Sequence, residues 1–334
     1  MSLPALIAIG LGFALTAYAI LAGADFGAGI LDLTSGHSLE QRTALARTIG
    51  PLWEANHVWL IFSITILFSA FPTGFAALGT VLLAPFTLAV MAIVVRGVAF
   101  SLRTDAPGHQ ARSARLLGCA FGAGSVAAPL LFGASAAALA QVSSSTHAAA
   151  TVSSLPWTGL FAVIVGLLAV ALCAHVAATF VTYRLERASQ TALADRFRRR
   201  GLQTGASLLA LSLLALLAAD WKAPALWHRL STAALPLLVI GLLTTVLSLY
   251  GLASRRYLLA RGATMLTAGA IVWGWLVAQS PRLIGARLTI HTAAATHAAL
   301  TALAIAGAAV LVAVLPAFYL LYVLFAHPSP EMTQ

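Results

Sequence analysis

The stretch that decides the fold is residues 4–33, PALIAIGLGFALTAYAILAGADFGAGILDL, in which Asp25 and Asp32 are the only charged residues. A helix needs about 20 mostly apolar residues to cross the hydrocarbon core of a bilayer, and this run is long enough. It begins without a basic region and stays apolar beyond Ala17-Tyr18-Ala19. We therefore expect a retained first membrane helix here, not a cleaved signal peptide.

Similar apolar runs recur along all 334 residues. The chain is 60% hydrophobic and 8% charged, with a mean hydropathy of +0.95, whereas a soluble domain has about a quarter charged residues. We predict one all-α, polytopic transmembrane domain over 1–334, with two four-helix bundles and one peripheral helix. The nine predicted helices cover about 4–33, 52–71, 78–101, 115–140, 156–181, 202–219, 231–252, 263–280 and 298–325.

The basic residues orient these helices. The connections are short, and the longest, about 182–201, carries six arginines. With nine spans, the loops on one side hold fourteen basic residues and those on the other side hold four, namely Lys222, Arg229, Arg282 and Arg287. By the positive-inside rule the richer side is cytoplasmic. We therefore expect the N-terminus outside and the C-terminus in the cytoplasm, and the net charge of +10 indicates topology and not a nucleic-acid partner.

Few charges fall inside the predicted helices. Asp25, Glu54 and Arg96 do, and Asp32 lies near the aqueous edge, where we expect it to be solvated. Each such charge costs about 2.5–3.5 kcal/mol at a helix centre, so it is informative. The group could line a proton or cation path from the cytoplasm, because buried carboxylates can carry protons near neutral pH. Equally, Arg96 could pair with Asp25 or Glu54 and only pin helices together.

The second helix adds polar groups to this region. It opens with Trp53-Glu54-Ala55-Asn56-His57-Val58-Trp59-Leu60, in which Glu54 and His57 share a helix face. Trp53 and Trp59 fit helix packing or an interfacial aromatic belt. On the first helix, Gly23 and Gly27 flank Asp25 and would let another helix approach closely.

Cofactor motifs are absent from the sequence. Cys119 and Cys173 lie in apolar runs, and the intramembrane histidines, His57, His175 and His297, show no paired ligand spacing. We expect this chain to bind no haem or metal and to contain no catalytic residue.

Several motifs in order resemble subunit II of the cytochrome bd-type quinol oxidases. They are Ala22-Gly23-Ala24-Asp25-Phe26-Gly27-Ala28-Gly29, Ile49-Gly50-Pro51-Leu52-Trp53-Glu54-Ala55-Asn56-His57-Val58-Trp59-Leu60, Phe71-Pro72, Arg96-Gly97-Val98-Ala99-Phe100 with Arg103, and near the end Leu288-Thr289-Ile290, Ala293-Ala294-Ala295 and Leu315-Pro316. The resemblance covers most of the first 103 residues and about 40 near the end.

The resemblance implies a heterodimer in the bacterial inner membrane. A homologous subunit I would hold two b-type haems and one d-type haem, oxidise quinol and reduce oxygen to water. The family can also hold a structural quinone and a small single-helix accessory subunit. By position, Glu54 takes the place of the Asp in the family's Trp-Asp-Gly-Asn motif on a proposed proton path. Asp25 matches the second Asp of its Asp-Gly-Phe-Asp motif.

The sequence departs from the family pattern at several acidic positions. Ala22 replaces the first Asp of the first motif, and Ser101 stands where an acid usually precedes the arginine. His57 follows Asn56 where the family has Glu or Gln. The proton path could run through Glu54, Asn56 and His57 with Asp25 and Arg96 nearby, since imidazole relays protons near neutral pH, or the subunit could be mainly a scaffold. A stand-alone proton-coupled transporter using Asp25, Glu54 and Arg96 is the alternative from another class.

Overall fold

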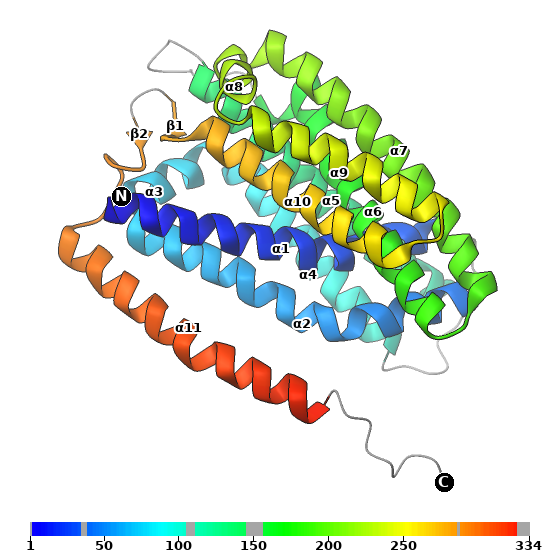
Figure 1. The fold of residues 1–334 in the computed structure, drawn as a ribbon. Coiled ribbons are helices and arrows are strands. Elements are labelled where there is room, and N and C mark those ends of the chain that lie inside the picture. Colours follow the sequence, from blue (N-terminus) through cyan, green and yellow to red (C-terminus); the bar gives the residue numbers. More distant parts are fainter. Residues whose placement is uncertain (1, 35–38, 105–110, 145–155, 286–287, 326–334) are drawn as a thin grey trace.

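The computed structural model describes residues 2–34, 39–104, 111–144, 156–285 and 288–325. It describes the helix but not the side chains at 39, 43, 46–55, 103–104, 111–114, 144, 310–311, 313–315 and 317–325. The described chain is almost entirely helical (Figure 1). Its main helices are α1 (Leu3–Leu33), α2 (Leu39–Ala70), α4 (Leu83–Thr104), α5 (Ala111–Ser144), α6 (Leu160–Arg187), α7 (Thr191–Lys222), α9 (Leu235–Ala253), α10 (Tyr257–Gln279) and α11 (His297–Phe325).

Seven of the described helices are long and apolar enough to cross a membrane, and the bent pair of α2 and α3 (Pro72–Val81) makes an eighth if counted as one span. The structure thus confirms a mostly helical, multi-span protein. The count of nine spans, the two-bundle arrangement and the sidedness stay predictions.

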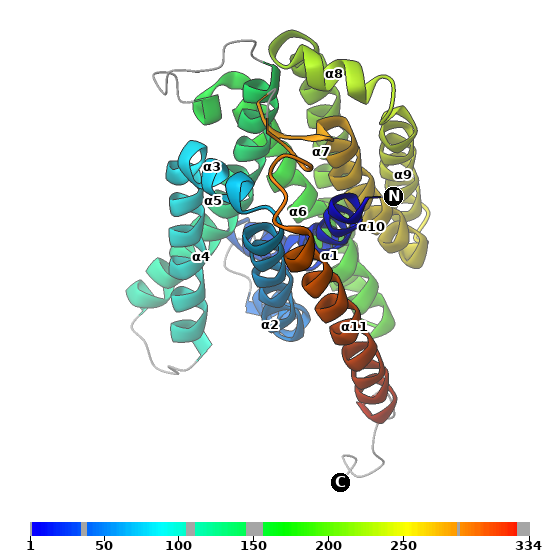
Figure 2. The ribbon, with the colours of Figure 1, turned by 90° about the vertical axis from the view of Figure 1, so that its left-hand side faces the viewer.

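Helix α1 lies at the centre of the molecule. It packs against α2, α5, α6 and α10, while α4 packs on α5. Helices α6, α7, α9 and α10 contact one another in sequence, and α10 also returns to α6. Helix α11 lies on the outside, beside α1 and α2 (Figures 1 and 2). The segment 22–29, which includes the sequence motif around Asp25, is therefore buried on all sides.

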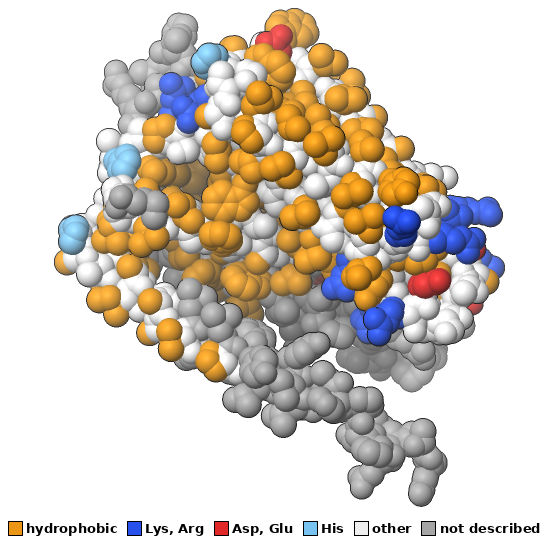
Figure 3. Space-filling view, in the orientation of Figure 1, with side chains coloured by type: hydrophobic (Ala, Val, Ile, Leu, Met, Phe, Trp, Pro, Cys, Tyr) orange, Lys and Arg blue, Asp and Glu red, His pale blue; other side chains and the backbone are white. Residues whose placement is uncertain are grey.

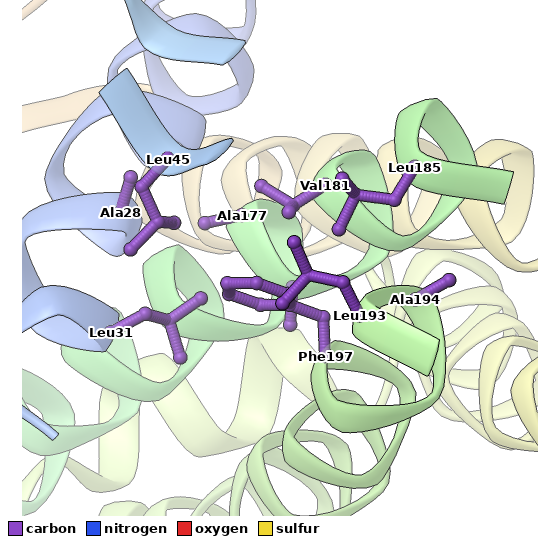
Figure 4. Close-up of a cluster of buried hydrophobic side chains, with 10 residues drawn as sticks. Ala28, Leu31, Leu45, Ala177, Val181, Leu185, Leu193, Ala194 and Phe197 are labelled. Atoms are coloured by element: carbon purple, nitrogen blue, oxygen red, sulfur yellow. The ribbon is translucent and has the colours of Figure 1, made fainter. Parts of the chain in front are cut away.

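Most of the predicted connector at 182–201 is helical. Helix α6 continues to Arg187 and α7 begins at Thr191, with Ser189 in a left-handed conformation at φ 58°. Arginines interrupt the apolar runs near both helix ends, but a helix need not end where its apolar run does. Apolar side chains still join these helix ends, as the cluster of Leu31, Leu45, Val181, Leu193 and Phe197 shows (Figure 4).

The connection after α2 also differs from the prediction. The sequence predicts a turn and the start of the third span over residues 72–81, whereas these residues form the separate helix α3, bent by 117° from α2. Elsewhere, α8 (Pro224–Leu230) and the antiparallel strands β1 (Arg282–Ile284) and β2 (Leu288–Thr289) fill connections. The small hairpin is a departure from the all-α prediction. All these elements lie at the end opposite the turn between α6 and α7 (Figure 1).

Candidate functional site

The buried centre of the first helices holds an ion pair between Asp25 on α1 and Arg96 on α4. Nη1 of Arg96 donates to Oδ2 of Asp25 at 2.9 Å, and Nη2 donates to Oδ1. Nη2 also donates to the backbone oxygen of Asp25 at 3.1 Å. Both residues are 1% exposed. Such a two-pronged contact between guanidinium and carboxylate fixes orientation as well as charge.

Aromatic rings and a hydroxyl complete the surroundings of Arg96. Its guanidinium carbon lies 4.9 Å from the ring centre of Phe26 and 5.0 Å from that of Phe121. Its Nε donates to the hydroxyl of Ser125 on α5 at 2.7 Å. Cation–π contacts of this kind favour a desolvated guanidinium. Arg96 is therefore held from α1, α4 and α5 at once.

Glycines allow α1, α4 and α5 to approach one another closely around Arg96. A Cβ at Gly124 on α5 would stand 2.6 Å from the backbone oxygen of Ala92 on α4, and one at Gly29 on α1 would overlap the Ser125 side chain. Because real Cβ atoms do not approach so closely, larger residues here would separate the helices. The glycines thus bring Ser125 within reach of Arg96.

Asn56 on α2 joins the pair from a third direction. Its Nδ2 donates to Oδ2 of Asp25 at 2.7 Å, and the residue is 1% exposed. Its Oδ1 is buried and has no hydrogen-bond partner among the described residues. Buried polar atoms are usually satisfied by protein or ordered water. The Oδ1 atom of Asn56 is thus a free buried acceptor, among the described residues, next to the hydrogen-bonded pair of Asp25 and Arg96.

The structure brings together three of the five candidate proton-path residues, Asp25, Asn56 and Arg96. The side chains of Glu54 and Trp53 lie outside the described part. His57 is half-buried, and the half-buried Trp59 packs edge-on against Phe62 with ring centres 6.3 Å apart.

The two glycines of the predicted packing motif meet α6. At Gly27 a Cβ would overlap the backbone of Cys173, whereas at Gly23 it would make ordinary contact with Val176 at 3.8 Å. The close approach of α1 and α6 therefore centres on Gly27.

Asp32 differs from the solvated residue that we expected. It is 6% exposed, and its Oδ1 lies 3.2 Å from Nε of Arg42. Because α2 begins at Leu39, well before the predicted start at about 52, its first turns cover the end of α1 and bring Arg42 to Asp32.

A second buried polar cluster was missed. His175 on α6 is 0% exposed; its Nδ1 lies 3.1 Å from the backbone oxygen of Gly201, and its Nε2 lies 2.9 Å from the hydroxyl of Ser248. Since a carbonyl only accepts, Nδ1 carries the proton. The Ser248 hydroxyl also forms a hydrogen bond of 2.7 Å with the hydroxyl of Thr264. The spacing of hydroxyl residues on α9 and α10 (Thr244, Ser248, Thr264 and Thr267) was the available signal.

No group of three or more His, Cys, Asp or Glu side chains that could hold a metal ion occurs within the described ranges.

An apolar helical assembly with a desolvated ion pair at its centre defines a multi-pass membrane protein that keeps ionisable groups inside its helix bundle. Comparison with known families then fixes its place among such proteins. The profile of the family described as cytochrome bd terminal oxidase subunit II matches residues 3–325, and the chain belongs to that family.

Individual relatives match over shorter stretches. Cytochrome bd ubiquinol oxidase subunit 2 of Bacillus subtilis is 41% identical over 83 residues, a quarter (25%) of each chain. Cytochrome bd-I ubiquinol oxidase subunit 2 of Escherichia coli is 31% identical over 93 residues, which are 28% of this chain and 24% of that one. A chain in the structure of bd oxidase from Geobacillus thermodenitrificans has the same fold, with a TM-score of 0.78 at 23% identity, over 98% of this chain and all (100%) of that one.

Proposed function

We propose that this chain is the haem-free subunit II of a bd-type quinol:oxygen oxidoreductase in the bacterial inner membrane. The match to the family over residues 3–325 carries the proposal. A haem-bearing subunit I would be its partner and hold the two b-type haems and the d-type haem, and oxygen would be reduced there. A structural quinone and a small accessory subunit are further components of the proposed complex. The family match also favours this function over a stand-alone transporter.

The basic end of the molecule is the cytoplasmic end in this proposal. Contacts among the described residues support one common basic end. Arg200 of α7 donates to the backbone oxygens of Leu31 and Thr34 at the end of α1. Arg255, in the turn between α9 and α10, pairs with Asp195 of α7 at 3.1 Å. Figure 3 shows a cluster of basic side chains at this end, beyond an apolar flank, and all are arginines because the one lysine, Lys222, lies at the other end of α7.

Within the complex, we assign Asp25 and Arg96 a fixed electrostatic and packing role. Both carboxylate oxygens of Asp25 accept from Arg96, and Oδ2 accepts also from Asn56. With these lone pairs engaged, the carboxylate has little room to accept a moving proton. Glu54 and His57 are the proposed proton carriers. The buried Oδ1 of Asn56, which has no partner among the described residues, is a suitable acceptor for a water molecule on this route.

The test is the variant Glu54→Gln in the purified two-subunit complex. We expect quinol-driven oxygen consumption to fall by about tenfold or more, because glutamine cannot carry a proton. The matched control is Glu40→Gln on the same helix. Glu40 is exposed, and its ion pair with Arg196 spans 3.7 Å, so its loss should cost little.

Assembly must be checked in the same preparations. A companion chain and an unchanged haem spectrum in both variants would show that the loss concerns turnover. Full turnover in Glu54→Gln would reject the proton route and leave a scaffold role. A haem-free single chain that transports a solute would reject the oxidase assignment itself.

A further inference from the structure

Two arginines meet on one tyrosine at the basic end of α6 and α10. The guanidinium carbon of Arg261 lies 4.7 Å from the ring centre of Phe180 and 5.1 Å from that of Tyr183. On the other side, Nη1 of Arg187 donates to the hydroxyl of Tyr183 at 3.4 Å. Tyr183 therefore lies in contact with two positive charges that come from different helices.

These two charges have no acidic partner among the described residues, and they differ from the equally unpaired Arg199 and Arg256 in their shared contact with Tyr183. At the same end, Arg198 and Arg255 both pair with Asp195, and Arg196 pairs with Glu40. Among the described residues, Arg187 and Arg261 form no ion pair with a carboxylate. To orient the helices in the membrane, an arginine needs only to place its charge on the cytoplasmic side. It does not require one arginine to stack on two rings beside a second arginine.

The surface next to Arg261 is apolar and exposed. On the side of α10 that carries Arg261, Leu258 is 67% exposed and Met265 is 36% exposed, and Leu266, which is 60% exposed, lies further around the helix. Gly262 adds no side chain, and a Cβ there would meet nothing within 4 Å. A phosphate bound at Tyr183 would therefore have lipid-facing apolar surface directly below it.

We propose that Arg187, Tyr183 and Arg261 bind the phosphodiester headgroup of an anionic glycerophospholipid, with an acyl chain along Met265 of α10. Guanidinium groups bind phosphate oxygens through paired N–H donors, and stacking on Phe180 and Tyr183 holds Arg261 in place for this contact. The Tyr183 hydroxyl accepts from Arg187 and can donate its own proton to the phosphate. Basic sites at the cytoplasmic ends of helices attract anionic headgroups by about 1 kcal/mol per charge.

The test is native mass spectrometry of the intact complex titrated with phosphatidylglycerol, in parallel with phosphatidylcholine. We expect one phosphatidylglycerol to bind tightly, and Arg261→Gln or Arg187→Gln to weaken its binding by about fivefold each. Arg261→Lys, which keeps the charge but loses the planar stacking group, should weaken binding less than Arg261→Gln. The control is Arg199→Gln, an exposed arginine of α7 at the same end.

Melting temperatures of all variants identify any that fail to fold, and Tyr183→Phe then provides a milder change that keeps the ring. Equal phosphatidylglycerol binding in the wild type and in the glutamine variants would overturn the proposal. So would displacement of the lipid by millimolar inorganic phosphate, which would indicate a free-anion site, or equal retention of phosphatidylcholine. The outcome is independent of the proton route, because none of these residues belongs to it.

Discussion

Arg96 is the single residue on which the buried centre depends most. Arg96→Met would leave the carboxylate of Asp25 desolvated, with only the amide of Asn56 directed at it among the contacts described above. Breaking a buried pair by removing one partner typically costs about 3–5 kcal/mol. We expect a markedly lower melting temperature of the complex and poor assembly, measured by the yield of co-purified haem.

The double variant Asp25→Leu/Arg96→Met separates pairing from packing. Replacing both charges by apolar residues of similar size is often close to neutral, so the double variant should recover much of the stability lost in the single one. If the two changes simply add, the residues are not energetically coupled, and the ion pair does not hold α1 to α4.

At the residue scale, the sequence allowed Asp25 and Arg96 to be predicted as a group because so few charges lie in apolar runs. The sequence did not reveal which carboxylate pairs with Arg96, since both Asp25 and Glu54 were predicted to lie in the same half of the membrane. Asn56 and Ser125 could not be assigned to the pair either. Their contacts depend on the rotation of each helix about its axis, and helices that are apolar on all sides give no periodicity from which to infer it.

Helices α1 and α6 approach each other closely at Gly27, and this contact offers a direct test of helix packing. In Gly27→Ala, the new Cβ would overlap the backbone of Cys173, a rigid neighbour that cannot rotate away. We expect a loss of about 1–3 kcal/mol or more in stability, as for other overpacked cores. Gly10→Ala on the same helix is the matched control, because nothing lies within 4 Å of that Cβ.

Thermal unfolding of the two variants, monitored by the haem spectrum of the complex, gives the comparison. Similar melting temperatures in the two variants would mean that α1 and α6 can move apart without a loss of stability.

Helix existence was predictable, but helix ends were not. About 20 apolar residues identify a span, and the predicted segments overlap α1, α2, α4, α5, α6, α7, α9, α10 and α11. The polar turns of α6 and α7 extend beyond the apolar windows, and their stability comes from contacts such as those of Phe197 and Leu185. Helix α3 was missed because Pro72 and Gly74 read as a turn, although proline is also well suited to the first turn of a helix.

For the whole molecule, the distribution of arginines predicts orientation. A green fluorescent protein fused after Gln334 should fluoresce. The C-terminus is predicted to be cytoplasmic, and this reporter forms its chromophore in the cytoplasm. Alkaline phosphatase fused at the same point should be inactive, since it needs the oxidising outer compartment for its disulfides. The reverse pattern would invert the topology and place the basic end outside.

The pairing of Asp25 with Arg96 also has a consequence for biosynthesis. Helix α4 enters the bilayer with an arginine whose insertion alone costs about 2.5–3.5 kcal/mol at a helix centre. Its carboxylate partner lies on α1, which leaves the ribosome earlier, whereas Ser125 on α5 follows later. Pairing of the Arg96 side chain with Asp25 can therefore offset this cost before the second half of the chain has been translated.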